Sequence, residues 1–409
     1  MNPTITLCMI VKNESAVILQ CLESMSKYID RYDITDTGST DGTQDIIRKF
    51  FAEKGIPGEI YQSDWKGFGD HAGRIGSRTE AFRNCDGKAD YVWVIDADDY
   101  LEGDFKYPPT MNAAAYALTF KRDDFTWWRT QIFKNELLWR YVGVLHEYPD
   151  TDKKPYAVEK IHGNYHVTAR TAGFERNANK TLVEKYSKDA ETLVKALEED
   201  PTNVRYMFYL GQSYFDSQQW GNAEDAYLKR SKMGDWGEEV FFSLYRAAIC
   251  KILQAKAWPE IYDAFLDAYE SRPTRAEPLY QLARLNRLHN RPRTGFIYAQ
   301  MAAQIPYPQE DLLFVDHGIY KWGILDEISS TAWYAGKPHI GFEASRVLLQ
   351  EKRLPQDQTD RVTKNFLTYK DMLEKLHTQQ QMNVEAEKEK AKQQKKQQKK
   401  MKRMQKLRR

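Results

Sequence analysis

The sequence has 409 residues, 42% of them hydrophobic and 29% charged, which indicates a globular protein too long for one core. Its net charge of +2 is unevenly distributed, because residues 378–409 hold 12 Lys or Arg and 3 Glu, which leaves 48 basic and 55 acidic residues elsewhere. The sequence has no apolar run long enough to span a membrane and no N-terminal leader, which favours a soluble cytoplasmic protein. Because the body of the chain is acidic, nucleic acid is not an expected partner.

The N-terminal segment 4–11 is apolar and predicts a buried strand. The polar residues 12–15 interrupt it where a βα loop would face a ligand. Asn13 or Ser15 would cap the helix that follows over residues 16–28.

A second strand, at residues 32–36, turns through Gly38 and Gly42 into a predicted helix over residues 44–54. The succession of strand, polar glycine turn and helix is the βαβ pattern of nucleotide-binding sheets. Glycine-rich turns alone carry little weight, so the assignment depends on the motifs that follow.

A third apolar run, Tyr91–Ile95, ends abruptly in the carboxylates Asp96, Asp98 and Asp99. The run reads as a strand of a parallel sheet that is buried on both faces, and ligands of such sheets bind at the carboxyl ends of the strands. Asp96 and Asp98 point the same way in extended backbone, so one divalent cation could bridge them to a diphosphate. The alternative is a strand followed by an acidic, solvated turn.

Together, residues 10–14, 36–43 and 96–99 resemble, in order and spacing, the motifs of the family 2 glycosyltransferases of GT-A (Rossmann-like) fold. The resemblance covers about the first 170 residues. It implies that Asp36 accepts a hydrogen bond from uracil N3–H, that Asp96 faces the ribose and metal, and that Asp98 is the main ligand of Mn²⁺ or Mg²⁺. The implied nucleotide-sugar-binding residues are Val11, Asn13, Glu14, Asp36, Gly38, Ser39, Asp41, Arg78, Asp96 and Ala97.

Arg78 enters this set because residues 64–82 look like a family element in which an arginine opens a helix and reaches the diphosphate. A guanidinium binds phosphate oxygens bidentately. Residues 70–76 are extra relative to that element, which makes Arg74 a rival for the same role.

Residues 133–147 resemble a region of one branch of these enzymes that ends in His146-Glu147. The better-known branch places its base in a Glu-Asp pair, which this interval lacks. Inverting transfer needs a carboxylate that removes the acceptor proton, and Glu147 is the candidate. His146 or His166 would complete the metal shell, because imidazole suits Mn²⁺.

From residue 171 onward the pattern becomes helical, with small and aromatic residues at the spacing of tetratricopeptide repeats. The first copy includes Tyr206, Leu210, Gly211 and Tyr214 with Ala223 and Tyr227, and weaker copies begin near Ala248, Leu282 and Ala332. Such repeats bind peptides or partner proteins, pad a catalytic domain or form a homodimer.

Three regions follow: a GT-A domain at residues 1–170, a tetratricopeptide-like helical domain at 171–377 and a basic tail at 378–409. The tail lacks apolar residues and is expected to be disordered or a solitary helix. The four cysteines, Cys8, Cys21, Cys85 and Cys250, have no metal-ligand spacing and are expected to be buried free thiols.

The expected function is metal-dependent transfer of a sugar from a UDP-sugar, with inversion, to a protein or glycan acceptor. One alternative is a non-catalytic helical-repeat scaffold with a relic nucleotide-sugar-binding domain. Another is a nucleotidyltransferase, which would need a basic glycine-rich signature that residues 12–14 do not provide.

Overall fold

A computed structural model describes residues 3–122, 125–170 and 181–407, without the side chains of Phe125 and of residues 398–407. The chain packs as two compact units, Met1–Ala223 and Glu224–Arg409. The domain boundary predicted between residues 170 and 171 borders the segment 171–180, which lies outside the described residues.

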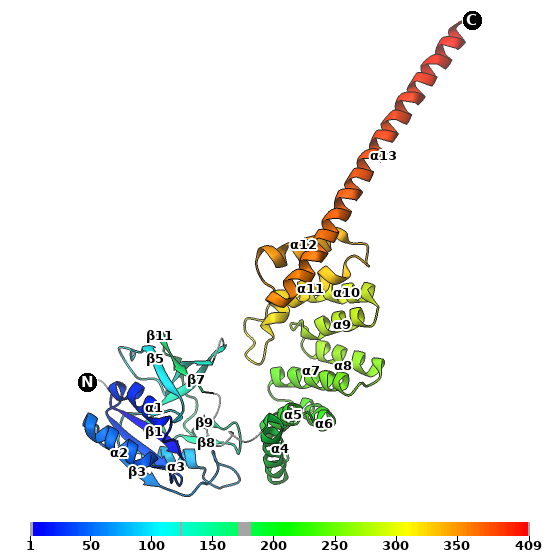
Figure 1. Ribbon diagram of the computed structural model, residues 1–409. Helices are drawn as coiled ribbons and strands as arrows, with labels where there is room; N and C mark the ends of the chain where they lie inside the picture. The colour runs from blue at the N-terminus through cyan, green and yellow to red at the C-terminus, as the bar shows by residue number, and fades with distance from the viewer. Residues whose placement is uncertain (1–2, 123–124, 171–180, 408–409) are drawn as a thin grey trace. The chain divides into compact units, whose positions relative to one another are not determined.

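The first unit is built on a nine-stranded mixed sheet with the order β3-β2-β1-β4-β7-β6-β11-β5, and β10 pairs with β6 (Figure 1). The strands are β1 (Ile5–Val11), β2 (Arg31–Asp36), β3 (Gly58–Gln62), β4 (Tyr91–Val94), β5 (Tyr100–Asp104), β6 (Ala115–Arg122), β7 (Phe125–Lys134), β10 (Val158–Lys160) and β11 (Asn164–Thr168). A separate two-stranded sheet consists of β8 (Arg140–Val142) and β9 (Tyr148–Asp150).

The strands β1 to β4 are parallel to one another, in the order of one half of a doubly wound nucleotide-binding sheet. Val11 pairs with Asp36, so the carboxyl ends of β1 and β2 lie at the same edge. On its other side β4 pairs with β7, which is antiparallel to it. The sheet is therefore parallel in its N-terminal half and mixed beyond it.

Helices cover both faces of the parallel half. Side chains of β1 such as Leu7 and Met9 share a core with α1 (Ile18–Met25) and α2 (Thr43–Lys54). Cys8 points the other way and packs with residues of α3 (Ser77–Asn84) and of β4. This alternation explains why the strand is apolar throughout.

The start of the first helix differs from the sequence prediction. Helix α1 begins at Ile18, its N-cap is Val17, and no side chain caps it. The side chains of Asn13 and Ser15 instead bond to the loop after β2, because Asn13 Oδ1 accepts the N–H of Thr40 and Ser15 bonds to Asp41. The competing tertiary partners explain why the capping prediction was wrong.

After the sheet the described chain is helical. The helices are α4 (Leu182–Glu199), α5 (Val204–Asp216), α6 (Trp220–Ser231), α7 (Gly237–Leu253), α8 (Trp258–Ser271), α9 (Glu277–Leu288), α10 (Pro292–Ala303), α11 (Ile324–Thr331), α12 (Pro338–Gln350) and α13 (Thr359–Leu407). The later helices stack in pairs (Figure 1). The predicted fold class, an α/β nucleotide-sugar transferase domain followed by tetratricopeptide-like helices, is confirmed.

Small residues occupy the contacts between paired helices. A Cβ on Gly295 of α10 would lie 2.9 Å from the carbonyl oxygen of Ala283 in α9, closer than carbon and oxygen can approach. Ala248, Ala299 and Ala332 are fully buried in the same core. The repeat pattern of the sequence therefore corresponds to the seams between helices.

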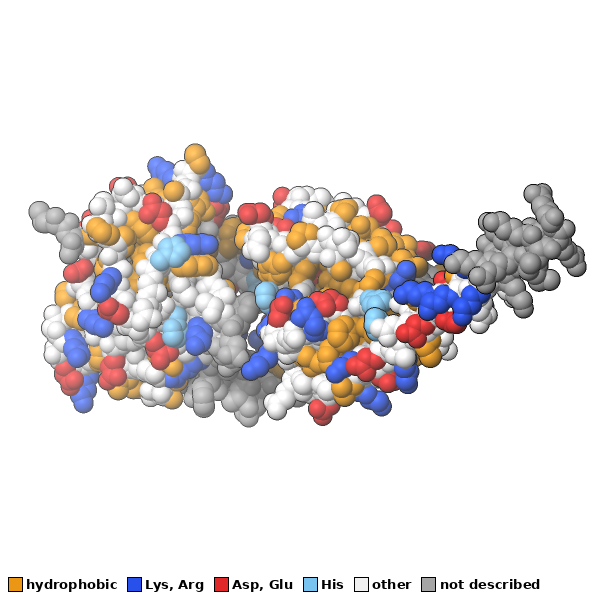
Figure 2. Space-filling model, turned by 90° about the horizontal axis from the view of Figure 1, so that it is seen from above, with side chains coloured by type: hydrophobic (Ala, Val, Ile, Leu, Met, Phe, Trp, Pro, Cys, Tyr) orange, Lys and Arg blue, Asp and Glu red, His pale blue; other side chains and the backbone are white. Residues whose placement is uncertain are grey.

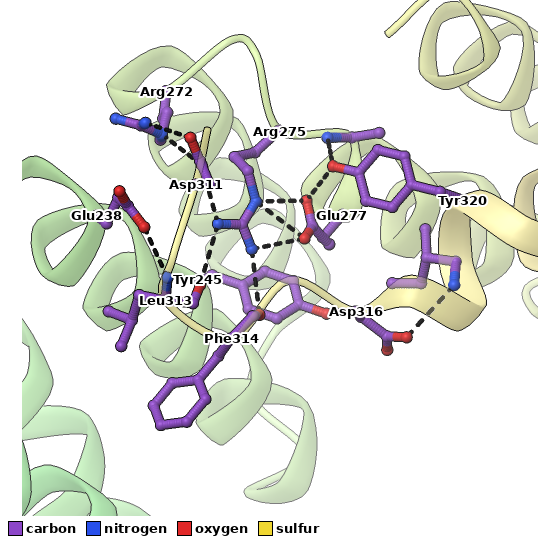
Figure 3. A network of polar contacts seen from close by, with 12 residues as sticks. Glu238, Tyr245, Arg272, Arg275, Glu277, Asp311, Leu313, Phe314, Asp316 and Tyr320 are labelled. Atoms are coloured by element: carbon purple, nitrogen blue, oxygen red, sulfur yellow. Dashed lines mark hydrogen bonds and ion pairs between the residues drawn. The ribbon is translucent and has the colours of Figure 1, made fainter. Parts of the chain in front are cut away.

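A buried ionic network fastens the segment between α10 and α11 to the helices of the second unit (Figure 3). Arg275 is 1% exposed in its side chain and pairs with Glu277 at 2.6 Å and with Asp311 at 3.2 Å. Arg272 also binds Asp311, at 2.6 Å, and Glu238 accepts hydrogen bonds from the backbone of the segment.

The basic tail is helical as far as Leu407 at the end of α13, which extends beyond α12 (Figure 1). Residues 374–397 of α13 are exposed. Acidic and basic side chains are interspersed on the face of the chain in Figure 2. None of the described helices combines the length and apolar character needed to cross a lipid bilayer.

All four cysteines are buried and free, as predicted.

Candidate functional site

The candidate site lies at the carboxyl edge of β1, β2 and β4, where two loops are bonded to each other. Asn13 donates its backbone N–H to Ser39 Oγ at 3.0 Å, and its Oδ1 accepts the N–H of Thr40 at 2.9 Å. The N–H of Glu14 donates to Thr43 Oγ1 at 2.8 Å. Asn13 has a φ of 55°, and its side-chain bond to the facing loop stabilises that left-handed conformation.

Asp41 connects the same two loops. Its Oδ2 accepts the N–H of Ser15 at 2.9 Å and its Oδ1 accepts the N–H of Thr43 at 3.0 Å. Burial acts to raise the pKa of Asp41, but the hydrogen bonds from Thr43 and Ser15 outweigh it and hold the pKa well below its usual range. Both oxygens are engaged, so Asp41 fixes the shape of the loops.

Asp36, the last residue of β2, is 1% exposed. Its Oδ1 accepts the N–H groups of Gly38 and Ser39, each at 2.7 Å, and thereby shapes the turn. Its Oδ2 is buried and has no hydrogen-bond partner among the described residues. An unpaired buried carboxylate oxygen is unfavourable unless a ligand supplies a donor, which fits the predicted bond from uracil N3–H.

Four charged side chains meet beside this edge. Arg78 donates through Nη2 to Asp96 Oδ1 at 2.6 Å, and its Nε lies 2.7 Å from Glu147 Oε1. Arg129 Nη1 lies 3.3 Å from Asp96 Oδ2. Burial acts to raise the pKa of Asp96, but the two guanidinium groups outweigh it and hold the pKa well below its usual range.

Arg78 is held firmly at the start of α3. Its side chain is 9% exposed and lies near the rings of Phe68 and Tyr141, at 5.7 and 5.5 Å. Burial acts to lower the pKa of Arg78, but the charges of Asp96 and Glu147 outweigh it and raise the pKa. The guanidinium therefore stays charged while it is buried.

The rival arginine lies elsewhere, because the extra residues 70–76 form a closed excursion. The backbones of Gly69 and Gly76 adjoin so closely that a Cβ on Gly76 would lie 2.4 Å from Gly69. Arg74 reaches Glu199 of α4, at 3.0 Å, and its side chain is 67% exposed. Of the two arginines, the structure brings Arg78 to the charged cluster.

Arg129 was not among the site residues predicted from the sequence. It lies on β7, which runs antiparallel to β4, so the amino-terminal part of β7 extends past the end of β4 toward Asp96. The only sequence feature that points to Arg129 is its position in a strand rich in aromatic residues. Its proximity to Asp96 depends on the pairing of β7 with β4, which is non-local in sequence.

The other acidic residues after β4 differ in environment. Asp98 is half-buried and Ala97 is buried. Asp99 is 5% exposed and accepts the backbone N–H of Arg170 at 3.3 Å. Burial, with the charges of Asp96 and Asp98, raises the pKa of Asp99 to about 8.

The structure does not gather the candidate metal-binding histidines around Asp98. His166 lies opposite Glu102 on β5, with its Nε2 3.3 Å from Glu102 Oε2. His146 stacks on Tyr209 of α5, at 3.9 Å and 12° between planes. Desolvation and the charges of Arg205 and Lys185 lower the pKa of His146 to about 4. Within the described part of the chain, no three His, Cys, Asp or Glu side chains are grouped to hold a metal ion.

A divalent cation at this edge would therefore take few ligands from the protein. The oxygen of Asp98 is of the kind that Mg²⁺ and Mn²⁺ prefer, and cations at diphosphate sites commonly keep phosphate oxygens and waters as their other ligands. The donor set fits a cation that arrives with a diphosphate.

The part of the chain that carries this site matches a known family. Residues 6–182 match the family described as glycosyl transferase family 2. A search of curated proteins found no match to the sequence. Similar solved structures include S. aureus TarS residues 1–349 in complex with UDP-GlcNAc, with 14% identity, a TM-score of 0.37 and coverage of 66% of this chain and 91% of that one.

Two helical proteins are also similar. MamA has 14% identity and a TM-score of 0.31, with coverage of 51% of this chain and 99% of that one. YrrB, a TPR protein with an unusual peptide-binding site, has 13% identity and a TM-score of 0.32, with coverage of 47% and 95%. The match to the family and the sheet with its carboxyl-edge site together identify residues 6–182 as a glycosyl transferase family 2 domain.

Proposed function

We propose that this protein transfers a sugar from a UDP-sugar to a protein or glycan acceptor, with inversion at the anomeric carbon and with a divalent cation. The observation that carries the proposal is the cluster in which Arg78 contacts both Asp96 and Glu147. These residues come from three separate segments, and the proposal assigns the diphosphate to Arg78, the donor side to Asp96 and the acceptor proton to Glu147.

The donor would bind along the edge formed by the first two loops. Asp36 Oδ2 would accept uracil N3–H, because it is the buried oxygen that lacks a partner. Asn13 and Glu14 would line the base and ribose, and the backbone at Val11, Gly38 and Ser39 would complete that wall. Arg78 would turn from its carboxylate partners to the diphosphate, to which it can donate two parallel hydrogen bonds.

Transfer would need a base on the acceptor side. A bond forms between the acceptor oxygen and the anomeric carbon while the bond from that carbon to the diphosphate oxygen breaks, and UDP leaves with the electron pair. The acceptor proton would pass to Glu147, whose side chain is 13% exposed beside Arg78. Attack from the face opposite UDP inverts the anomeric carbon.

Asp98 would hold the cation, with Asp96 beside it. The cation supplies positive charge that stabilises the leaving diphosphate. Arg78 and Arg129 would add to that charge from the protein side, because both guanidinium groups already lie at Asp96.

The test is UDP binding and donor hydrolysis across a panel of UDP-sugars with Mn²⁺ or Mg²⁺, since water can replace an unknown acceptor. We expect micromolar to millimolar UDP binding, as for ordinary enzyme substrates, and turnover of at least one donor that chelation abolishes. Absence of both UDP binding and turnover would favour the non-catalytic scaffold.

Two variants assign the roles within that assay. Glu147→Gln should retain UDP-sugar binding and lose about 10²-fold or more in turnover, because the amide cannot accept a proton. Asp98→Asn should lose a similar factor, because the charge that holds the cation is removed. The exposed residue Glu53 of α2 provides the control Glu53→Gln. Turnover above about a tenth of wild type would reject Glu147 as the base, and Asp99 would be tested next.

A further inference from the structure

The loop that carries Glu147 joins the short strands β8 and β9 and has no regular secondary structure. Two of its residues have left-handed backbone, Gly143 at a φ of 118° and His146 at 51°. Such a conformation is unfavourable for histidine and persists only where the surroundings enforce it. The contacts that enforce it therefore determine where Glu147 lies.

Helix α5 supplies those contacts. The backbone N–H of Val144 donates to the hydroxyl of Tyr206 at 3.2 Å, and that hydroxyl lies 3.1 Å from His71 Nδ1. Arg205 donates through Nη2 and Nε to the carbonyl oxygen of His146, at 2.8 and 3.3 Å. Two neighbouring residues of one helix thus bind the backbone on both sides of Leu145.

Aromatic stacking adds to these bonds. The ring of His146 lies on Tyr209, one helical turn after Arg205. The guanidinium of Arg205 lies over Tyr209 at 4.9 Å and over Tyr148 at 4.8 Å. Residues on both sides of Glu147 are therefore packed against the same face of α5.

The excursion at residues 70–76 connects the loop of Glu147 to helix α4, which precedes α5. Gly143 donates its N–H to the carbonyl oxygen of Asp70 at 2.9 Å. His71, which follows Asp70 in the chain, contacts Tyr206. The Nε2 of His71 also lies 3.1 Å from Glu199 Oε2 of α4. Helices α4 and α5 thus hold two loops that meet at Gly143, and all of these residues lie within the first compact unit.

We propose that Tyr206 and Arg205 are positioning residues for the transfer reaction, which hold the loop 143–148 so that Glu147 faces the reacting atoms beside Arg78 and Asp96. The sequence pattern assigned Tyr206 to the core of the first repeat, and the residue is buried, with 3% of its surface exposed. Its hydroxyl nevertheless accepts a hydrogen bond from the backbone of Val144 in the loop. The role in catalysis rests on the proposed function of Glu147, whereas the role in holding the loop does not.

The test combines Tyr206→Phe in the full-length protein with hydrogen exchange and donor hydrolysis. Loss of the hydroxyl should speed exchange of the Val144 amide about tenfold or more and leave exchange in β1 and β4 unchanged. Donor turnover should fall about tenfold or more, and the dissociation constant of UDP should stay within about twofold, because misplacing a base affects the chemical step.

Matched variants separate positioning from general damage. Tyr214→Phe removes a hydroxyl from the same helix about two turns away and should change neither measurement. Arg205→Ala should behave like Tyr206→Phe, and Arg205→Lys should recover part of the turnover, because an ammonium can still donate to the His146 carbonyl.

Several outcomes would overturn the inference. Unchanged exchange at Val144 would show that α5 does not hold the loop, and faster exchange with unchanged turnover would show that the held position does not matter to the reaction. An equal loss of UDP binding and turnover would indicate structural damage instead of positioning. If the wild-type protein neither binds UDP nor turns over a donor, the proposed function fails, and the exchange measurement still decides whether Tyr206 holds the loop.

Discussion

Asp36 divides its two oxygens between different tasks. Oδ1 holds the turn through Gly38 and Ser39, and Oδ2 is buried without a hydrogen-bond partner among the described residues. Removing the whole side chain would therefore disturb both the loop and the ligand contact. A substitution that changes one oxygen alone separates the two.

Asp36→Asn makes that separation. The amide oxygen can still accept from Gly38 and Ser39, while the amide nitrogen would oppose uracil N3–H, donor against donor. We expect UDP binding to weaken by about 1.5–3 kcal/mol, roughly ten- to a hundredfold, with little change in thermal unfolding. Titration of UDP measures the effect.

Asp45→Asn on α2 is the matched control, because that side chain is 87% exposed and its loss should leave UDP binding unchanged. A dissociation constant that is the same in Asp36→Asn and wild type would show that the uracil contact lies elsewhere.

At the scale of residues, the sequence is sufficient to place side chains that follow a strand directly. Asp36 and Asp96 lie where their strands predicted, although their roles stay predictions. Arg129 could not be found in this way, because its position depends on β7 pairing with a strand more than thirty residues earlier. His166 is a similar case, since its register against β5 places it opposite Glu102.

At the scale of elements, strands and repeat helices could be predicted because their signals are local and periodic. The short runs of β1 and β4 and the small residues between helix pairs are examples. The mixed half of the sheet was less predictable, because the order of its strands is set by long-range pairing. The predicted cap of α1 was wrong for the same reason, because the side chains of Asn13 and Ser15 bond to Thr40 and Asp41 of the facing loop.

The network around Arg275 gives a prediction for the helical unit. Arg275→Met would leave Glu277 buried without its counter-charge and would leave Asp311 with Arg272 alone, so we expect this unit to lose about 3–5 kcal/mol of stability. Arg346→Met, at an exposed pair with Glu343, should change stability little.

Thermal unfolding, with limited proteolysis of the segment 304–318, measures this effect. The segment should be cleaved earlier in Arg275→Met, because Arg275 also donates to the carbonyl oxygens of Leu313 and Phe314. Equal unfolding midpoints for the two variants would show that the buried network is not needed to hold the segment.

At the scale of the whole molecule, charge is separated along the chain. Residues 378–409 carry 12 of the 60 Lys and Arg, and the side chains of residues 374–397 are exposed. This exposed part of α13 contributes almost no apolar burial to either unit.

Deleting residues 378–409 should therefore leave the unfolding temperature and donor turnover within error of the full-length protein. Circular dichroism should lose helical signal in proportion to the residues removed. Precipitation of the truncated protein, or a lower unfolding temperature for either unit, would contradict this expectation.

The attachment of α5 to the loop of Glu147 also bears on how such chains recombine. An exchange of genetic modules at the last strand, β11, would give the sheet a new set of repeats but would remove Arg205, Tyr206 and Tyr209. An exchange after the end of α6, the helix in which the first compact unit ends, would keep them. Helices α4 and α5 would thus act as an adapter, and we expect an exchange of the repeats beyond them to keep the contacts that hold the loop of Glu147.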